Sequence, residues 1–104
     1  MGRESTLDRW GNEIYLTDER WEHIVETHEE MTGCRDHIFT TIRTGKRRQD
    51  AFDSSKYKYT RGFNNLPMGF SHVVVVVKFS RRITPEGVDI PNNFILTAYQ
   101  VSRR

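Results

Sequence analysis

Cysteine is almost absent from this chain, which has only Cys34 among its 104 residues. A single cysteine cannot form an internal disulfide, so the disulfide-rich class of small proteins is excluded and a reducing compartment is indicated. No cysteine and histidine pattern has zinc-finger spacing. His23 and His28 are five residues apart, about 140° around a helix, so they do not present two metal ligands on one face. We therefore expect neither a metal site nor a cofactor.

Long hydrophobic runs, repeats and low-complexity tracts are also missing. No apolar stretch approaches the roughly 20 residues that cross a membrane, and the first residues lack the hydrophobic core of a signal peptide. The length is typical of one domain. Six phenylalanines, four tyrosines and two tryptophans provide large side chains for a folded core. We expect one cytoplasmic domain, residues 1–104, with no membrane partner.

Charge of one sign is not in large excess, because the formal net charge is +2, but the charges are unevenly distributed. The first 30 residues are rich in acids, residues 35–82 are basic, and the chain ends in Arg103 and Arg104. A local basic surface suits a polyanion such as RNA. Scattered lysines and arginines can equally form a solvated face, and composition alone leaves both interpretations open.

Two helices are predicted in the first half of the chain. The first covers 18–31, begins at Thr17 or Asp18 as the N-cap, and ends before Gly33. One apolar stripe of about 100° on this helix contains Trp21, Ile24, Val25 and His28. A histidine there is either a hydrogen-bonded core residue or a catalytic group that reaches a cleft. The second helix covers 35–44 and is expected to bury Cys34, Ile38, Phe39 and Ile42.

The rest of the chain is predicted to form a sheet. Strands are expected at 13–16, 49–53, 56–63, 72–80 and 94–101, of which the valine-rich segment 72–80 is the strongest. Segments 84–87 and 91–93 indicate an irregular connection. The expected fold class is α+β, with two N-terminal helices packed on one face of a four- to five-stranded antiparallel sheet. The other face would be partly open and could bind a ligand.

Polar side chains in the last strands are candidates for chemistry. Alternation places Lys78 on the face of Val74 and Val76, and it places Thr97 and Tyr99 together on the face of Ile95 and Val101. A lysine within a valine strand departs from the local pattern, as residues at functional sites often do. The structural alternatives are a Lys78 that reaches solvent at the strand end and a Tyr99 that packs its ring in the core.

Several of these segments resemble the ribonuclease superfamily that unites barnase, EndoU, the tRNA-cleaving colicins and the RelE toxins. Its phage and bacterial toxin-like branches carry a helix of the type Trp-x-His-Ile-x-x-x-His-Pro-Glu, then basic, tyrosine-rich and valine-rich strands, and a final strand ending like Ile-x-Thr-Ala-Tyr. The matching segments here are 21–30, 49–50, 57–61, 73–78 and 95–99. Glu29 stands where the branch usually has proline.

The resemblance implies metal-independent RNA cleavage by attack of a 2′-hydroxyl on the adjacent phosphate. In this scheme His28 is the base or acid, because a histidine exchanges protons near neutrality. Lys78 and Arg61 would stabilise the phosphate, and Thr97 and Tyr99 would donate from the last strand. The resemblance also marks His23, although helical phase places His23 near the solvent face. The expected RNA-binding residues are Arg47, Arg48, Lys56, Lys58, Tyr59 and Arg61.

Three functions remain open on sequence grounds. The first is a toxin-like endoribonuclease with an RNA substrate and an antitoxin as a potential partner. The second is a non-catalytic module that binds RNA or a protein on the same fold. The third is a small structural or inhibitor protein whose basic patch meets an acidic partner.

Two further histidines, His37 and His72, carry no motif and are predicted to be ordinary surface or capping residues.

Overall fold

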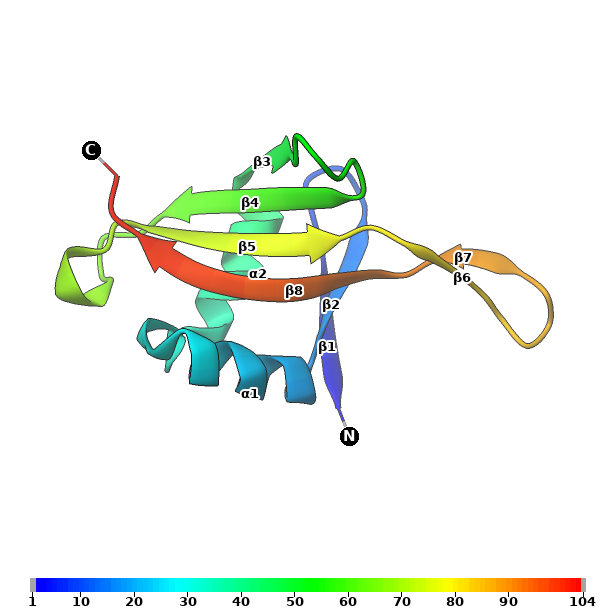
Figure 1. The fold of residues 1–104 in the computed structure, drawn as a ribbon, viewed down its shortest axis with the longest axis horizontal. Helices are drawn as coiled ribbons and strands as arrows, with labels where there is room; N and C mark the ends of the chain where they lie inside the picture. The colour runs from blue at the N-terminus through cyan, green and yellow to red at the C-terminus, as the bar shows by residue number, and fades with distance from the viewer. Residues whose placement is uncertain (1, 104) are drawn as a thin grey trace.

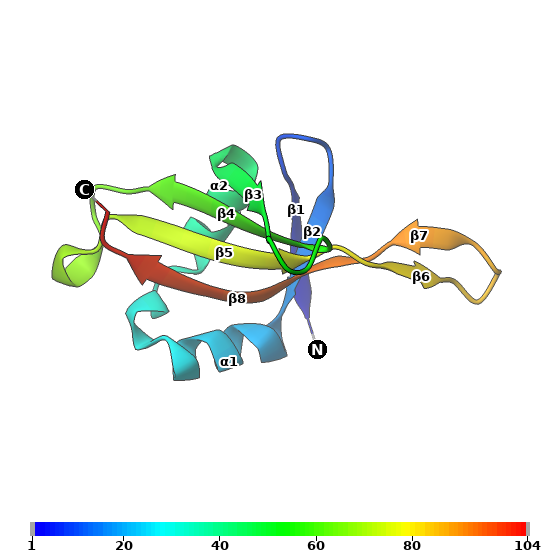
Figure 2. The same ribbon diagram turned by 45° about the horizontal axis from the view of Figure 1, so that its top comes forward.

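The computed structural model describes residues 2–103 and is an α+β fold (Figures 1 and 2). Its helices are α1 (Asp18–Thr27) and α2 (Arg35–Thr44), with short 3-10 helices η1 (Glu29–Met31) and η2 (Pro67–Gly69). Its strands are β1 (Arg3–Leu7), β2 (Glu13–Thr17), β3 (Lys46–Gln49), β4 (Lys56–Gly62), β5 (His72–Lys78), β6 (Arg81–Ile83), β7 (Asp89–Pro91) and β8 (Asn93–Val101). No helix within residues 2–103 is long and apolar enough to cross a membrane.

Six strands form the main sheet in the order β1-β2-β8-β5-β4-β3. All neighbours are antiparallel except β2 and β8, which run parallel where Ile14 pairs with Asn93 and Tyr15 with Phe94. The sheet is therefore mixed and larger than the predicted four- to five-stranded antiparallel sheet. The unexpected β1 is polar and mostly exposed, so its sequence carries no strand alternation, and its conformation follows from pairing with β2.

The helices begin largely as predicted, but α1 ends earlier. The side chain of Thr17 caps α1 by accepting a hydrogen bond from the backbone N of Arg20 at 3.1 Å. The helix stops at Thr27, so His28 lies just beyond it and leads into η1. Helix α2 has the predicted bounds and ends at Gly45, where a Cβ would lie 2.5 Å from the carbonyl oxygen of Thr41. Glycine thus allows the end of α2 to meet β4.

The core lies between the helices and the sheet; in Figure 1, α2 lies behind β4, β5 and β8, and α1 lies below β8. The fully or nearly fully buried side chains include Ile14, Leu16, Ile24, Met31, Ile38, Phe39, Ile42, Tyr59, Val73, Val75, Val77, Ile95 and Ala98. The helices contribute one apolar stripe each, and β5 contributes alternate valines. The face of β3, β4, β5 and β8 that points away from these helices is left open.

Two connections differ from the prediction. The predicted strand 49–53 lies earlier, at Lys46–Gln49, because residues after Gln49 form a turn. In this turn the side chain of Asp50 accepts hydrogen bonds from the backbone N of Phe52 at 2.8 Å and of Asp53 at 2.9 Å. The expected irregular connection around 84–93 instead contains the two-stranded ribbon β6–β7, which projects from the body of the protein in both views (Figures 1 and 2).

A β-bulge in β8 changes the predicted face of Ile95. Val76 pairs with Thr97, whereas Val77 pairs with Ile95, so Leu96 is an extra residue in the ladder. Ile95 and Ala98 both point into the core, and strict alternation was wrong in grouping Ile95 with Thr97. Thr97 and Tyr99 follow the bulge and still share one face, which is the open one.

Candidate nucleic-acid interface

The open face of β3, β4, β5 and β8 is basic. Alternate positions on these strands are buried in the core, so the residues between them point to the opposite side. The cationic side chains that this register assigns to the open face are Lys46, Arg48, Lys56, Lys58 and Lys78. No acidic residue occupies an open-face position on these four strands.

One part of this face is hollowed into a groove of about 780 Å³, which we call the basic groove. It is lined by Thr44, Gly45, Lys46, Arg47, Arg48, Lys58, Thr60, Arg61, Gly62, His72 and Arg103. These residues come from the end of α2, from β3 and β4, from the start of β5 and from the C-terminal segment. The lining contains lysines and arginines and no carboxylate, so the electrostatic potential of the basic groove is positive.

Two cations oppose each other directly in the basic groove. Arg48 on β3 pairs in register with Lys58 on β4, and both side chains are exposed. Like charges at directly opposite positions destabilise a sheet. Within residues 2–103, no carboxylate forms an ion pair with Arg48 or Lys58. The backbone hydrogen bonds of its own turn are the main cause of the lowered pKa of Asp50, and the charge of Lys58 lowers this pKa slightly further.

Arg47 points to the other side of β3. Its guanidinium lies 4.1 Å from the ring centroid of Trp10 and 4.6 Å from that of Tyr57. One of its nitrogens is 3.6 Å from a carboxylate oxygen of Asp8, whose side chain is fully buried. These contacts join the β1–β2 turn to β3 and β4. Most of the Arg47 side chain is therefore used within the fold, although Arg47 also contributes to the lining of the basic groove.

Tyr59 was expected among the RNA-binding residues, but it is fully buried and therefore not accessible to RNA in this structure. Its hydroxyl donates a hydrogen bond to Asp8 at 2.6 Å. Burial and this bond raise the pKa of Tyr59. Burial alone would raise the pKa of Asp8, but hydrogen bonds from Tyr59, Asn12 and Trp10 lower it overall. The aromatic alternation of β4 thus supplies a core residue at this position.

The structure brings His28 and Tyr99 together at one edge of the open face. Their ring centroids are 5.6 Å apart. The Nδ1 of His28 lies 3.7 Å from a carboxylate oxygen of Glu30, and about one third of the His28 side chain is exposed. Thr97 precedes Tyr99 on the same face and pairs with Val76. His28 is therefore neither sealed in the core nor isolated, and its ring is accessible beside a tyrosine.

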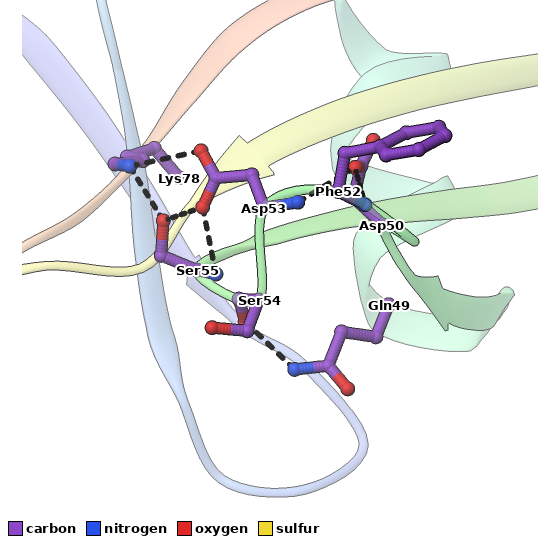
Figure 3. Close-up of polar contacts among 7 residues, drawn as sticks. All are labelled: Gln49, Asp50, Phe52, Asp53, Ser54, Ser55 and Lys78. Atoms are coloured by element: carbon purple, nitrogen blue, oxygen red, sulfur yellow. Dashed lines mark hydrogen bonds and ion pairs between the residues drawn. The ribbon is translucent and has the colours of Figure 1, made fainter.

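Lys78 is the last residue of β5, at the end far from the His28–Tyr99 pair, and its side chain contacts the turn before β4 (Figure 3). Its Nζ is 3.3 Å from a carboxylate oxygen of Asp53 and 2.5 Å from the Oγ of Ser55. Hydrogen bonds from Ser55, followed by that of Lys78, lower the pKa of Asp53 to about 2. Tyr99 pairs with Val74, four residues away, or about 13 Å along the strand. Lys78 and His28 are thus at different ends of the face.

His23 and Arg61 take separate positions. His23 is exposed on α1, in a hollow shared with three glutamates and Arg20. Acidic side chains outnumber basic ones around it, and it does not line the basic groove. Arg61 pairs with Val73 on the covered side of β4, and its guanidinium lies 4.6 Å from the ring centroid of Phe63, but it reaches the lining of the basic groove.

His72 is the residue that sequence reasoning missed. It is the first residue of β5 and lines the basic groove. Its Nδ1 lies 2.7 Å from the Oγ of Ser71. The alternation that places Val74 and Val76 on the open face also places His72 there, and this signal was available in the sequence. The missing information was the position of β3 and β4, because the groove is made by neighbouring strands.

Comparison of the chain with protein-family models, curated proteins and solved structures finds no match in any of the three. The ribonuclease resemblance therefore stays a prediction that rests on the short segments of the sequence. Within residues 2–103, no group of three or more histidine, cysteine, aspartate or glutamate side chains is placed to hold a metal ion. The site is consequently defined by its own side chains: the basic groove, His72, and the His28–Tyr99 pair.

Proposed function

We propose that this protein binds RNA on its open sheet face and cleaves it without a metal ion, by attack of a 2′-hydroxyl on the adjacent phosphate. The observation that carries this proposal is the basic groove, which has no carboxylate in its lining and sets Arg48 directly opposite Lys58. A bound phosphate would relieve the repulsion between these two cations. The release of counterions from RNA would add to the affinity.

RNA fits this surface better than a small anion does. The cations extend over β3, β4 and β5, so they can follow a chain of phosphates. Tyr99 adds a partly exposed aromatic ring on the same face. Open sheet faces that combine basic and aromatic side chains are typical of single-stranded RNA recognition, in which bases stack on the aromatic rings.

The cleavage chemistry needs groups that exchange protons and groups that stabilise phosphate charge. His28 is partly exposed and lies beside Tyr99, which suits proton transfer at the edge of the face. Arg48, Lys58 and Arg61 line the basic groove and would hold the phosphate. The resemblance to the ribonuclease superfamily supports the same reaction class.

A second candidate function is RNA binding without cleavage. It is favoured by the distance between the predicted catalytic residues, because Lys78 is held by Asp53 and Ser55 while His23 lies among acids on α1. In this case the basic groove would contact RNA through its charges alone. Binding would then depend steeply on salt, and no product would form.

The test compares a labelled RNA with a DNA strand of the same sequence, both incubated with purified protein in the presence of a metal chelator. We expect cleavage of RNA only, with 2′,3′-cyclic phosphate ends on the products, because DNA lacks the attacking hydroxyl. His28→Gln should reduce the rate about 100-fold, and the exposed His23→Gln is the matched control. Salt-dependent binding of intact RNA would establish the second candidate, and an absence of binding would exclude both.

A further inference from the structure

We propose that His72, positioned by Ser71, is a catalytic residue of the basic groove and exchanges a proton with the RNA whose phosphate the groove holds. This inference rests on the proposed RNA cleavage and adds to it a residue that has no motif in the sequence. Five features of the structure support the proposal: the place of His72 in the sheet, the glycine beneath its ring, its bond to Ser71, the charges around it, and its position relative to Tyr99.

The sheet places the His72 ring over a glycine. His72 pairs with Gly62 on β4 and with Val101 on β8. A Cβ at Gly62 would lie 3.3 Å from the Nε2 of His72, so the imidazole extends across this position. Because Gly62 has no side chain, the ring lies at the surface of the basic groove, which both residues line. The glycine thus makes room for a histidine that faces a ligand.

The bond to Ser71 leaves one nitrogen of the ring for the substrate. The Oγ of Ser71 lies 2.7 Å from Nδ1, and the same Oγ accepts a hydrogen bond from the backbone N of Arg103 at 2.8 Å. Within residues 2–103, no hydrogen bond reaches Nε2 of His72. With Nδ1–H donating to the Oγ of Ser71, the neutral ring has an unprotonated Nε2, which is free to take a proton from a ligand.

The charges around His72 attract a phosphate to it. Arg48, Lys58, Arg61 and Arg103 line the groove with His72. Cations stabilise the negative charge that develops on phosphorus oxygens during attack. Of the side chains in this lining, His72 is the one whose type commonly serves as a general acid or base in catalysis, since the others are lysine, arginine, threonine and glycine. A phosphate bound here therefore meets a proton-transfer group.

Tyr99 lies on the adjacent strand, and His28, the second proton-transfer group, lies beside it. His72 pairs with Val101 and Val74 pairs with Tyr99, so His72 and Tyr99 are diagonal neighbours on the open face. Diagonal positions on neighbouring strands are separated by about 7–8 Å. The ring of His28 lies beside Tyr99. His72 and the His28–Tyr99 pair thus lie at the same end of the face, on the two adjacent strands β5 and β8 and beside them.

The reaction follows from this arrangement. The unprotonated Nε2 of His72 takes the proton of the 2′-hydroxyl, and the 2′-oxygen forms a bond to phosphorus. The bond between phosphorus and the 5′-oxygen breaks, and this leaving oxygen takes a proton from the protonated His28. The products are a 2′,3′-cyclic phosphate and a free 5′-hydroxyl. One proton enters His72 for each proton that leaves His28, and no further reactant is needed.

The test measures two quantities on His72→Gln: the cleavage rate of an RNA, and the affinity for the same strand with 2′-deoxy sugars, which cannot be cleaved. We expect the rate to fall about 100-fold or more, with less than about a threefold change in affinity. Added imidazole should restore part of the rate of His72→Ala. The matched control is His37→Gln, because His37 lies on α2 outside the basic groove, and it should cleave at the wild-type rate.

Ser71 is a positioning residue, and its variants separate this role from folding. Ser71→Ala should reduce the cleavage rate about tenfold, whereas Ser71→Thr keeps the hydroxyl and should restore it. Wild-type cleavage by His72→Gln would overturn this inference and leave the proposed function standing. Equal losses of rate and affinity in His72→Gln would show a binding residue and also overturn it. A wild-type protein that cleaves no RNA would overturn the proposed function together with the role of His72.

Discussion

Arg47 and Arg48 are neighbours in β3, but the two faces of the sheet use them differently. On the covered side, Arg47 packs against Trp10 and Tyr57 and lies 3.6 Å from Asp8. On the open side, Arg48 is exposed and faces another cation, Lys58. The fold pairs the first charge with an acid within the protein, whereas the second charge has no acidic partner among residues 2–103.

The two ends of β5 show the same difference. Lys78 is bound by Asp53 and Ser55, so its charge serves the turn before β4 (Figure 3). His72 lies in the basic groove among cations that have no carboxylate in the lining. The two basic ends of β5 therefore differ in whether the protein supplies an acidic partner. Residue type alone does not distinguish the two ends.

The largest effect is expected from Lys58→Glu, which removes one cation from the open side and neutralises Arg48 opposite it. Each charged contact to a phosphate contributes about 1.5 kcal/mol, so the loss of two should weaken RNA binding about 100-fold. The free energy of unfolding should rise by about 0.5 kcal/mol, because an attractive pair replaces a repulsive one. Binding assays at several salt concentrations and urea unfolding measure the two effects.

The control for this variant is Arg82→Glu, which makes the same charge change on the projecting ribbon, where Arg82 is exposed. RNA affinity should change less than about threefold in this control. If both variants weaken RNA binding equally, net charge governs binding and the basic groove is not the site.

On the covered side, Asp8→Asn should lower the free energy of unfolding by about 2 kcal/mol. The buried carboxylate accepts hydrogen bonds from Tyr59 and Asn12 and lies near Arg47, and an amide cannot replace all of these contacts. RNA affinity should remain within about threefold of wild type. Urea unfolding measures the loss, with the exposed Glu22→Gln as control. Stability equal to wild type would refute a structural role for this network.

A smaller effect is expected from acid on the same network. The pKa of Asp8 is lower in the folded protein than in the unfolded chain, where a typical value is about 3.9. Its contribution is therefore present above the unfolded pKa and is lost as the pH falls through the folded pKa. Unfolding measured between about pH 5 and 2 should show a steeper loss in wild type than in Asp8→Asn. Parallel curves would exclude Asp8 as a source of acid sensitivity.

The smallest effect is expected from Lys78→Gln. The pair with Asp53 is partly exposed, with about one third of each side chain accessible, so its loss should cost no more than about 1 kcal/mol. Cleavage and RNA affinity should change less than about threefold. A tenfold or greater loss of cleavage with unchanged stability would restore the predicted catalytic role of Lys78.

The fold was predictable where a segment has its own periodicity. Helix α2 has the predicted bounds, and β4 and β5 begin at the predicted residues. Strand β1 and the parallel pairing of β2 with β8 were not predicted, because both depend on partners distant in sequence. The bulge at Leu96 has the same cause, since a ladder irregularity arises between two strands.

The basic charge of the candidate site was predictable, but its members were predictable only in part. Arg48 and Lys58 were expected to bind RNA and lie in the basic groove, whereas the aromatic pattern did not distinguish the buried Tyr59 from an exposed ring. His72 was not predicted to be a site residue, because no sequence motif includes it. The other residues of the basic groove come from α2, β3, β4 and the C-terminal segment, which are distant from His72 in sequence.

The amino-acid sequence by itself determined the elements with strong local patterns, the α+β class and the basic character of the second half of the chain. These properties follow from periodicity, capping and charge, which are local. Only the tertiary structure decided which charges are satisfied: Arg47 and Lys78 meet acids, while Arg48, Lys58 and His72 share an open groove. The physical reason is that a charge is neutralised by neighbours in space, and strand pairing selects those neighbours.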